Sequence, residues 1–138
     1  RMLITVADED KAQALELVRQ LAGLGFRLYA TAGTEQFLSQ HGLPVTAVGK
    51  LQDSARDILD LIEGHRVHLV INTPSRKSRA RRDGLAIRRA AVECGVPCLT
   101  SLSTAAALVR VIAAHTFAVE RLPAGRGLVT APAQRMSG

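Results

Sequence analysis

The chain has 138 residues, of which 47% are hydrophobic, and this is enough to bury the core of one domain. Lysine and arginine number 18 against 12 aspartate and glutamate residues, and the resulting net charge of +6 indicates an anionic partner. No apolar segment approaches the ~20 residues needed to cross a bilayer and no signal-peptide pattern opens the chain, so we expect a cytoplasmic protein with no membrane partner.

Strands and helices alternate along the first half of the chain. Each expected strand is a short apolar run, and the expected helices follow acidic or polar turns. We expect strands at residues 2–6, 26–30 and 43–48, and helices at residues 12–22, 35–40 and 55–62. Gly42 and Gly64 are expected to close the second and the third of these helices.

The most informative segment is residues 67–91, where a buried strand leads into a polar and basic loop. The aliphatic residues Val67, Leu69, Val70 and Ile71 are typical of an interior strand in a parallel sheet that is covered on both faces. We expect this strand to end at Thr73 and a basic loop, residues 74–83, to precede a helix at residues 84–93. A strand at residues 97–100 and a helix at residues 104–114 complete the alternation.

Five strands that alternate with helices through short connections predict right-handed crossovers and a parallel sheet. The expected fold class is α/β, a three-layer α/β/α sandwich with a five-stranded parallel sheet of the Rossmann-like kind. We expect one domain over residues 1–116. Residues 117–138 contain prolines and glycines and little apolar sequence, which predicts a partly flexible C-terminal tail.

Polar residues follow the expected strands, and the carboxyl ends of parallel strands meet at one edge of a sheet, where such folds bind ligands. The T-x-G-T turn at residues 31–34 offers hydroxyls and free backbone N–H groups at a helix N-terminus, which suit a phosphate. Two lysines add positive charge at the same edge. The candidate ligand-binding residues are Lys11, Thr31, Gly33, Thr34, Lys50, Asn72 and Thr73.

Each candidate also has a purely structural interpretation. Gly33 can relieve a turn and Thr34 can cap a helix. The two lysines taken singly are typical of solvated surface charges, and Asn72 at a strand end can form a turn. The convergence of all these residues on one edge favours a phosphorylated ligand over any single structural role.

The basic loop suggests a second class of function, because it contains several arginines and a lysine and only one acidic residue, Asp83. Such a cluster is compatible with a nucleic-acid-binding module. However, tryptophan is absent and Tyr29 is the only tyrosine, so side chains that stack on bases are scarce and we expect no specific nucleic acid partner. We interpret residues 76–82 as a mobile rim that attracts phosphate.

Residues that bind metals or catalyse reactions form no pattern of their own. Cys94 and Cys98 lack a second cysteine or histidine pair, so neither a zinc site nor a disulfide is expected. The four histidines stand apart from any nucleophile, and Asp53 and Asp57 are placed to stabilise a helix N-terminus. Because Walker and dinucleotide motifs are also missing, we expect no catalytic residue, no metal and no cofactor in this domain.

Six short motifs in a fixed order carry a resemblance to a known family. They are LITVADEDK, GFRLYATAGT, VGK, VINTPS, DGLAIRRAAV and VPCLTSLSTAAAL. Over residues 2–114 the chain resembles the methylglyoxal-synthase-like domains, and most closely those that form the C-terminal allosteric domain of carbamoyl-phosphate synthase large subunits. The resemblance implies the sandwich fold described above and a regulatory pocket for nucleotide effectors such as UMP, IMP or phosphoribosyl pyrophosphate.

The resemblance also implies roles for individual residues and partners. It assigns effector contacts to Lys11, Thr31, Thr34, Lys50, Asn72 and Thr73, nearly the same set as the strand-end argument. It implies that ATP and Mg or Mn act in other domains of the parent ligase, which makes carbamoyl phosphate for pyrimidine and arginine synthesis. The implied partners are the remaining large-subunit domains and the glutaminase small subunit. The basic rim, residues 76–82, is then also a candidate contact with the rest of the synthase. This domain itself is then non-catalytic.

Two departures from the family pattern change the expectation in detail. Pro74 stands where some members have a threonine, so a hydroxyl and a backbone donor are missing. Leu99 precedes Thr100 where ornithine-regulated members have an acidic residue, so we expect weak or absent ornithine regulation. Methylglyoxal synthase itself, which acts on dihydroxyacetone phosphate, is the enzyme alternative, but its Gly-Gly-Asp pattern is poorly matched by KLQDSARD and its second aspartate is missing from INTPSRKS.

Overall fold

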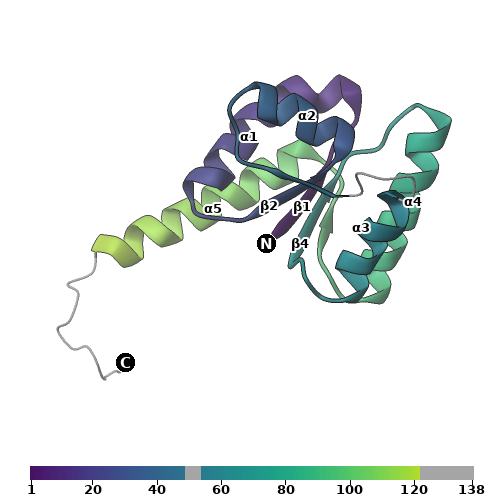
Figure 1. The fold of residues 1–138 in the computed structure, drawn as a ribbon. Coiled ribbons are helices and arrows are strands. Elements are labelled where there is room, and N and C mark those ends of the chain that lie inside the picture. The colour runs from purple at the N-terminus through teal and green to yellow at the C-terminus, as the bar shows by residue number, and fades with distance from the viewer. Residues whose placement is uncertain (49–53, 122–138) are drawn as a thin grey trace. The chain divides into compact units, whose positions relative to one another are not determined.

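The computed structural model describes residues 1–48 and 54–121 (Figure 1). The chain divides into two units after residue 107, and the described part of the second unit is residues 108–121. The strands are β1 (Met2–Thr5), β2 (Leu28–Thr31), β3 (Thr46–Val48), β4 (Leu69–Asn72) and β5 (Cys98–Leu99). The helices are α1 (Lys11–Gly23), preceded by the 3-10 turn η1 (Asp8–Asp10), α2 (Ala32–Gln40), α3 (Ser54–Glu63), α4 (Ser78–Glu93) and α5 (Leu102–Arg121).

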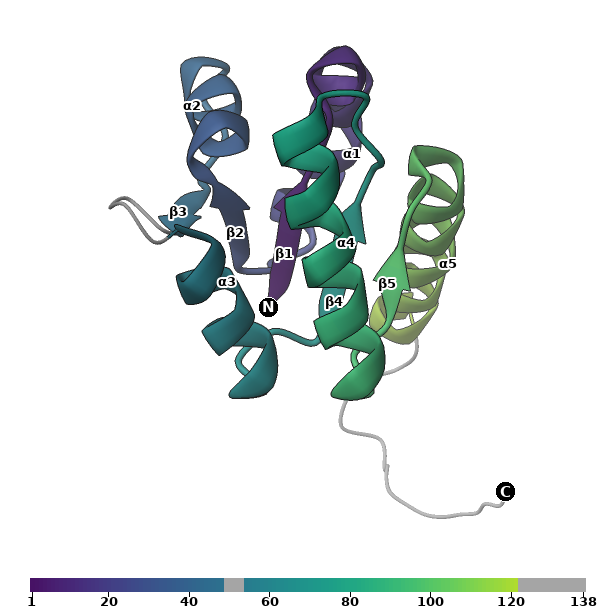
Figure 2. The ribbon, with the colours of Figure 1, turned by 90° about the vertical axis from the view of Figure 1, so that its right-hand side faces the viewer.

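The five strands form one parallel sheet in the order β3-β2-β1-β4-β5, which confirms the predicted sheet (Figure 2). The chain runs outward from β1 to β3, and then crosses back to the other side of β1 to form β4. The order of the strands therefore reverses between β1 and β4. In open parallel sheets the carboxyl ends of the strands on either side of such a reversal border the ligand-binding crevice.

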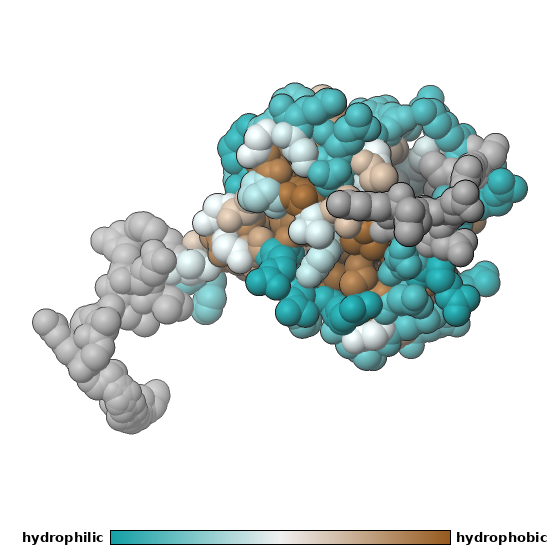
Figure 3. Space-filling model, in the orientation of Figure 1, coloured by the Kyte–Doolittle hydropathy of each residue, from teal (hydrophilic) through white to brown (hydrophobic). Residues whose placement is uncertain are grey.

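Helices cover both faces of the sheet, as predicted for a three-layer sandwich. Helices α1 and α2 lie on one face, and α3 and α4 lie on the other (Figures 1 and 2). All four residues of β1 and all four of β4 are buried, because each face of these central strands meets a helical layer. On the side of α3 and α4, the core joins Leu3, Val70, Ile62 and Ile87. In Figure 3, hydrophilic residues cover the outer helical surfaces and apolar residues show between them.

The largest difference from the predicted elements is the start of α4. We expect a basic loop up to residue 83, but α4 begins at Ser78, so that prediction is wrong and Arg81 and Arg82 lie in its first turns. Arginine and alanine are good helix formers and no glycine or proline interrupts residues 78–83, so nothing delays the helix. Gly84, taken as the start, instead lies buried inside the helix.

Smaller differences concern the ends of other helices. Helix α2 starts at Ala32, directly after β2, so Gly33 and Thr34 belong to its first turn. Gly42 has a positive φ of 76° after α2, as predicted for a closing glycine, whereas after α3 it is His65, and not Gly64, that adopts a positive φ, of 53°. Helix α5 continues to Arg121, past the predicted helix end. Most of the predicted tail, residues 122–138, lies outside the described residues.

The core predicts how the domain responds to truncation. Leu3 is fully buried at the centre of the sheet, so Leu3→Ala removes packing on the α3 and α4 side and should lower the free energy of unfolding by about 2–5 kcal/mol. Leu85→Ala is the matched control, because Leu85 is 56% exposed on α4 and its truncation should change stability by less than about 0.5 kcal/mol. Urea denaturation of both variants measures the difference, and equal losses would contradict the assigned core.

Candidate functional site

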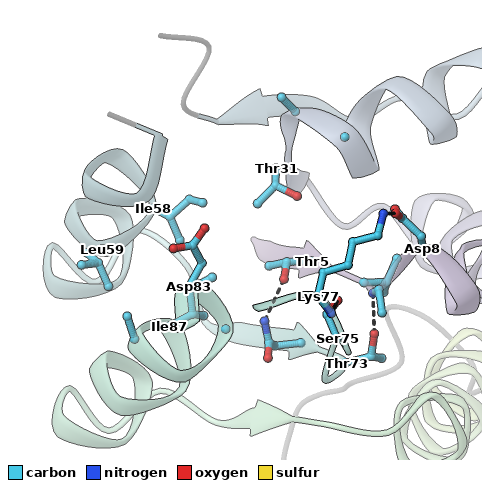
Figure 4. Close-up of a pocket in the computed structure, with 17 residues that line it drawn as sticks. Thr5, Asp8, Thr31, Ile58, Leu59, Thr73, Ser75, Lys77, Asp83 and Ile87 are labelled. Atoms are coloured by element: carbon cyan, nitrogen blue, oxygen red, sulfur yellow. Dashed lines mark hydrogen bonds and ion pairs between the residues drawn. The ribbon is translucent and has the colours of Figure 1, made fainter. Parts of the chain in front are cut away.

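A pocket of about 280 Å³ opens at the carboxyl ends of β1, β2 and β4 (Figure 4). It lies at the reversal of strand order between β1 and β4, where the topology places a ligand site. Its walls come from three strand ends, from the first turn of α2 and from the N-terminal halves of α3 and α4. The lining residues that matter for its chemistry are Thr5, Asp8, Thr31, Gly33, Ile58, Leu59, Asn72, Thr73, Lys77, Asp83, Ala86 and Ile87.

The polar floor of the pocket is a network that joins the ends of β1 and β4. The Asn72 side-chain amide donates from Nδ2 to Thr5 Oγ1 at 2.7 Å. The backbone N–H of Thr73 donates to the Thr5 carbonyl at 3.1 Å, and Thr73 Oγ1 accepts from the Ala7 N–H at 2.8 Å. Asn72 and Thr73 are buried, so these bonds satisfy polar groups that are shielded from bulk water and fix the strand ends.

The turn from β2 into α2 forms the second polar wall. Thr31 is the N-cap residue with an extended backbone, and its Oγ1 lies 3.2 Å from Thr34 Oγ1. Thr31 and Gly33 line the pocket, whereas Thr34 is only 2% exposed and accepts from the Val6 N–H at 3.4 Å. The first N–H groups of α2 have no partner within the helix, so this wall presents backbone donors and a positive dipole end.

Two lysines meet one carboxylate beside the pocket. Lys11 Nζ donates to Asp8 Oδ1 at 2.6 Å, and Lys77 Nζ donates to the other oxygen, Asp8 Oδ2. The hydrogen bonds from Lys11 and then Lys77 hold the pKa of the Asp8 carboxyl at about 2, and the bond to Asp8 raises the pKa of the Lys77 ammonium. Lys11 also approaches Gly33, since a Cβ built on Gly33 would lie 3.6 Å from Lys11 Nζ.

The opposite side of the pocket is apolar. Ile58 and Leu59 of α3 face the cavity together with Ala86 and Ile87 of α4 (Figure 4). Asp83, on the first turns of α4, adds one carboxylate to this side. The pocket therefore joins a wall of hydrogen-bond donors and cations to an apolar wall with an acceptor at its edge.

The structure brings four of the seven predicted ligand-binding residues together in the pocket. Thr31, Gly33, Asn72 and Thr73 line the pocket together. Lys11 lies beside it through Asp8 and Gly33, Thr34 lies behind it, and Lys50 lies outside the described residues. Thr5, Asp8, Lys77 and Asp83 also line the pocket but are not among the predicted ligand-binding residues. Thr5 ends β1, Asp8 follows β1 and Lys77 follows β4, and these positions were a usable signal, because the carboxyl ends of all strands meet at this edge.

Two findings on the described part of the chain concern metals and membranes. Within residues 1–48 and 54–121, no three histidine, cysteine or acidic side chains are grouped as a metal would require. No helix in these ranges is both long and apolar enough to span a bilayer. Cys94 and Cys98 are free thiols, and burial raises the pKa of the Cys98 thiol.

Comparison with known proteins now identifies the family. The MGS-like domain model matches residues 13–100. The chain belongs to the MGS-like domain family. It is 47% identical over 128 residues to the carbamoyl phosphate synthase large chain of Thermomicrobium roseum, an alignment that covers 91% of this chain and 12% of that relative. The chain thus spans about one eighth of the length of this relative.

Solved structures confirm the fold of this MGS-like domain. The crystal structure of methylglyoxal synthase from Elizabethkingia anophelis NUHP1 superposes with a TM-score of 0.65 and 19% identity, covering 78% of this chain and 75% of that chain. The crystal structure of ForH gives a TM-score of 0.62 and 19% identity over 83% of this chain and 80% of that one. At such low identity the likeness concerns the fold alone.

The Asp8 cluster predicts a pH dependence of stability. Because the folded pKa of Asp8 is about 2, below its ordinary value of 3.8, its ion pairs stabilise the fold above about pH 4 and are lost as the pH falls toward 2. The contribution is small, since the carboxylate is exposed and solvent screens it. Urea midpoints of the wild type and Asp8→Asn should differ at pH 7 and converge near pH 2. A difference that stays constant over this range would contradict the assignment.

Proposed function

We propose that this chain is the allosteric domain of a carbamoyl-phosphate synthase large subunit and that its pocket binds a phosphorylated nucleotide effector. The single observation that carries the proposal is the division of the pocket into a donor-rich wall at the strand ends and an apolar wall on α3 and α4. A nucleotide has the same division, with an anionic phosphate at one end and a flat base at the other. The 47% identity to a large chain supports the choice of parent protein.

The phosphate is proposed to bind at the β2–α2 turn. Thr31 offers a hydroxyl and Gly33 lies among the free N–H groups of α2, a combination that binds anions in many proteins. Lys11 supplies a positive charge next to this turn. Lysine ammoniums neutralise a phosphate while hydroxyls and amides orient it, so the three groups act together.

The base is proposed to lie against the apolar wall. Ile58 and Ile87 belong to the buried core and reach the cavity from two adjacent helices, so their positions are fixed by packing. Asp83 can accept a hydrogen bond from a ribose hydroxyl or from an N–H group of the ligand. A pocket of this kind favours a nucleotide over inorganic phosphate, because only the nucleotide fills both sides.

In the parent protein the effector would change how this domain contacts its neighbours. Coupling requires that the effector bind one state of the assembly more tightly than another. Helix α4 carries both a pocket wall and the exposed arginines Arg81, Arg82 and Arg89, so a shift of this helix can reach a neighbouring surface. ATP, Mg or Mn and the glutaminase partner belong to the other parts of the proposed ligase, whose product feeds pyrimidine and arginine synthesis in the cytoplasm.

A ligand screen tests the proposed function. Calorimetric titration of this chain with UMP, IMP and phosphoribosyl pyrophosphate should show binding of at least one of them, with a rise in melting temperature that grows with ligand concentration. Lys11→Ala should weaken this binding by about 10- to 100-fold, because a charge-assisted bond to phosphate is lost. Arg19→Ala is the matched control, because Arg19 pairs with Glu16 on the exposed side of α1 and this variant should bind the nucleotide as the wild type does.

The outcomes of the screen discriminate between the classes of function. No binding of any nucleotide would contradict the proposal, and salt-dependent binding of arbitrary DNA duplexes instead would favour a nucleic-acid module. Ornithine is included as a negative control, because an acidic partner for its ammonium is missing before Thr100.

A second assay tests the alternative of a methylglyoxal synthase. That reaction needs a carboxylate base, and Asp8, with a pKa of about 2 and two lysine partners, is a weak base at neutral pH. We therefore expect no release of phosphate from dihydroxyacetone phosphate. Asp83 also faces the pocket, and Asp53 lies outside the described residues, so both are tested. Turnover that disappears in Asp83→Asn or Asp53→Asn would establish the enzyme instead.

A further inference from the structure

A line of hydrogen bonds runs from helix α4 to the floor of the pocket. Arg88 donates from Nη1 to Asn72 Oδ1, and Asn72 donates from Nδ2 to Thr5 Oγ1 at 2.7 Å. These three residues come from α4, β4 and β1, and the last two line the pocket. Figure 4 shows the bond that reaches Thr5 at the pocket floor. Asn72 is only 2% exposed, so its amide depends on these two partners.

The chemistry of Arg88 fixes the direction of the whole line. A guanidinium has only donors, so the Asn72 atom that faces it must be the carbonyl oxygen. The Asn72 amide then has one orientation, with its NH₂ group directed at Thr5. The Thr5 oxygen receives this hydrogen bond as an acceptor. Arg88 therefore orients the Asn72 amide, and this orientation makes the Thr5 oxygen a hydrogen-bond acceptor toward Asn72.

The Thr5 hydroxyl keeps one donor for a ligand. A threonine hydroxyl has one hydrogen in addition to its acceptor lone pairs. Among the side chains that the structure describes, the Thr5 hydroxyl takes part in one hydrogen bond, and in it the Thr5 oxygen is the acceptor. Thr5 lines the pocket beside the strand ends, so this hydrogen can point at a bound molecule. An acceptor oxygen of a ligand is the partner that fits.

Gly84 leaves room for the contact between Arg88 and Asn72. Gly84 lies one turn before Arg88 on the buried side of α4. A Cβ on Gly84 would lie 3.2 Å from Arg88 Nη1, closer than most real Cβ contacts, and 3.4 Å from Asn72 Oδ1. The absence of a side chain at Gly84 thus leaves the space in which the guanidinium reaches the amide. This gives the D-G-x-x-I-R motif of the chain a physical role that the proposed function does not use.

We infer that Thr5 is a further ligand-binding residue, which donates a hydrogen bond to an acceptor oxygen of the bound effector, and that Arg88 is the positioning residue that sets this polarity through Asn72. The inference rests on the proposed nucleotide site and adds a donor to it. It selects ligands that present an oxygen acceptor, such as a phosphate oxygen, against the pocket floor.

Three variants test the role of Thr5 with the nucleotide that binds the wild type. Thr5→Val keeps the shape and loses the hydroxyl, so its Kd should rise about tenfold, as expected for a lost bond to a charged oxygen. Thr5→Ser keeps the donor and should stay within about threefold of the wild type. Thr5→Ala also removes the hydroxyl and replaces Thr5→Val in the test if that variant does not fold. Thermal unfolding checks that each variant is folded.

A double-mutant cycle tests the role of Arg88. Arg88→Met should weaken binding several-fold in the wild-type background and add no further loss in the Thr5→Val background, because the donor that Arg88 orients is already gone. If Arg88 had a purely structural role, Arg88→Met would weaken binding by the same factor in the wild-type and in the Thr5→Val background. If the wild type binds UMP but Thr5→Val binds it equally well, the inference alone is overturned. If the wild type binds no nucleotide at all, the proposed function fails first.

Discussion

The buried amide of Asn72 is the interaction on which the site depends. It lies where β1 and β4 end side by side, at the reversal of strand order. An amide buried without partners would destabilise the fold by several kcal/mol, typically about 2–7. Thr5 and Arg88 satisfy it, so the same bonds that make its burial tolerable also hold the pocket floor in one arrangement. A preorganised floor of this kind binds without first ordering its own side chains.

Beside that floor, an internal carboxylate weakens the attraction of the two lysines for an anionic ligand. Asp8 occupies the ammonium groups of Lys11 and Lys77, so an incoming anion must compete with an internal carboxylate. The lysines therefore contribute less than free cations would, and neutral donors at the β2–α2 turn gain importance. In the proposed function, this balance lets a strongly basic chain keep a pocket that selects its ligand, because a bare cluster of lysines binds any polyanion.

Residues close in sequence were predictable, whereas long-range pairs were not. The alternation of strands and helices along the chain was enough to predict the parallel sheet. The rule that the carboxyl ends of parallel strands meet at one edge was enough to predict that Thr31, Gly33, Asn72 and Thr73 lie together. The contact from Arg88 to Asn72 joins residues 16 positions apart on different elements, and the one from Lys77 to Asp8 joins residues 69 apart. Neither leaves a local pattern. The early start of α4 was missed because Gly84 was read as a boundary, although its helical position relieves crowding.

Amide chemical shifts test the central claim most directly. A labelled sample titrated in parallel with UMP and uridine, and with IMP and inosine, compares ligands that differ only in the phosphate. The account predicts that a nucleotide shifts the backbone amides of Gly33 and Thr34 at the start of α2, and that its nucleoside does not. Shifts confined to Arg81, Arg82 and Arg89 on α4, with Gly33 and Thr34 unmoved, would contradict it.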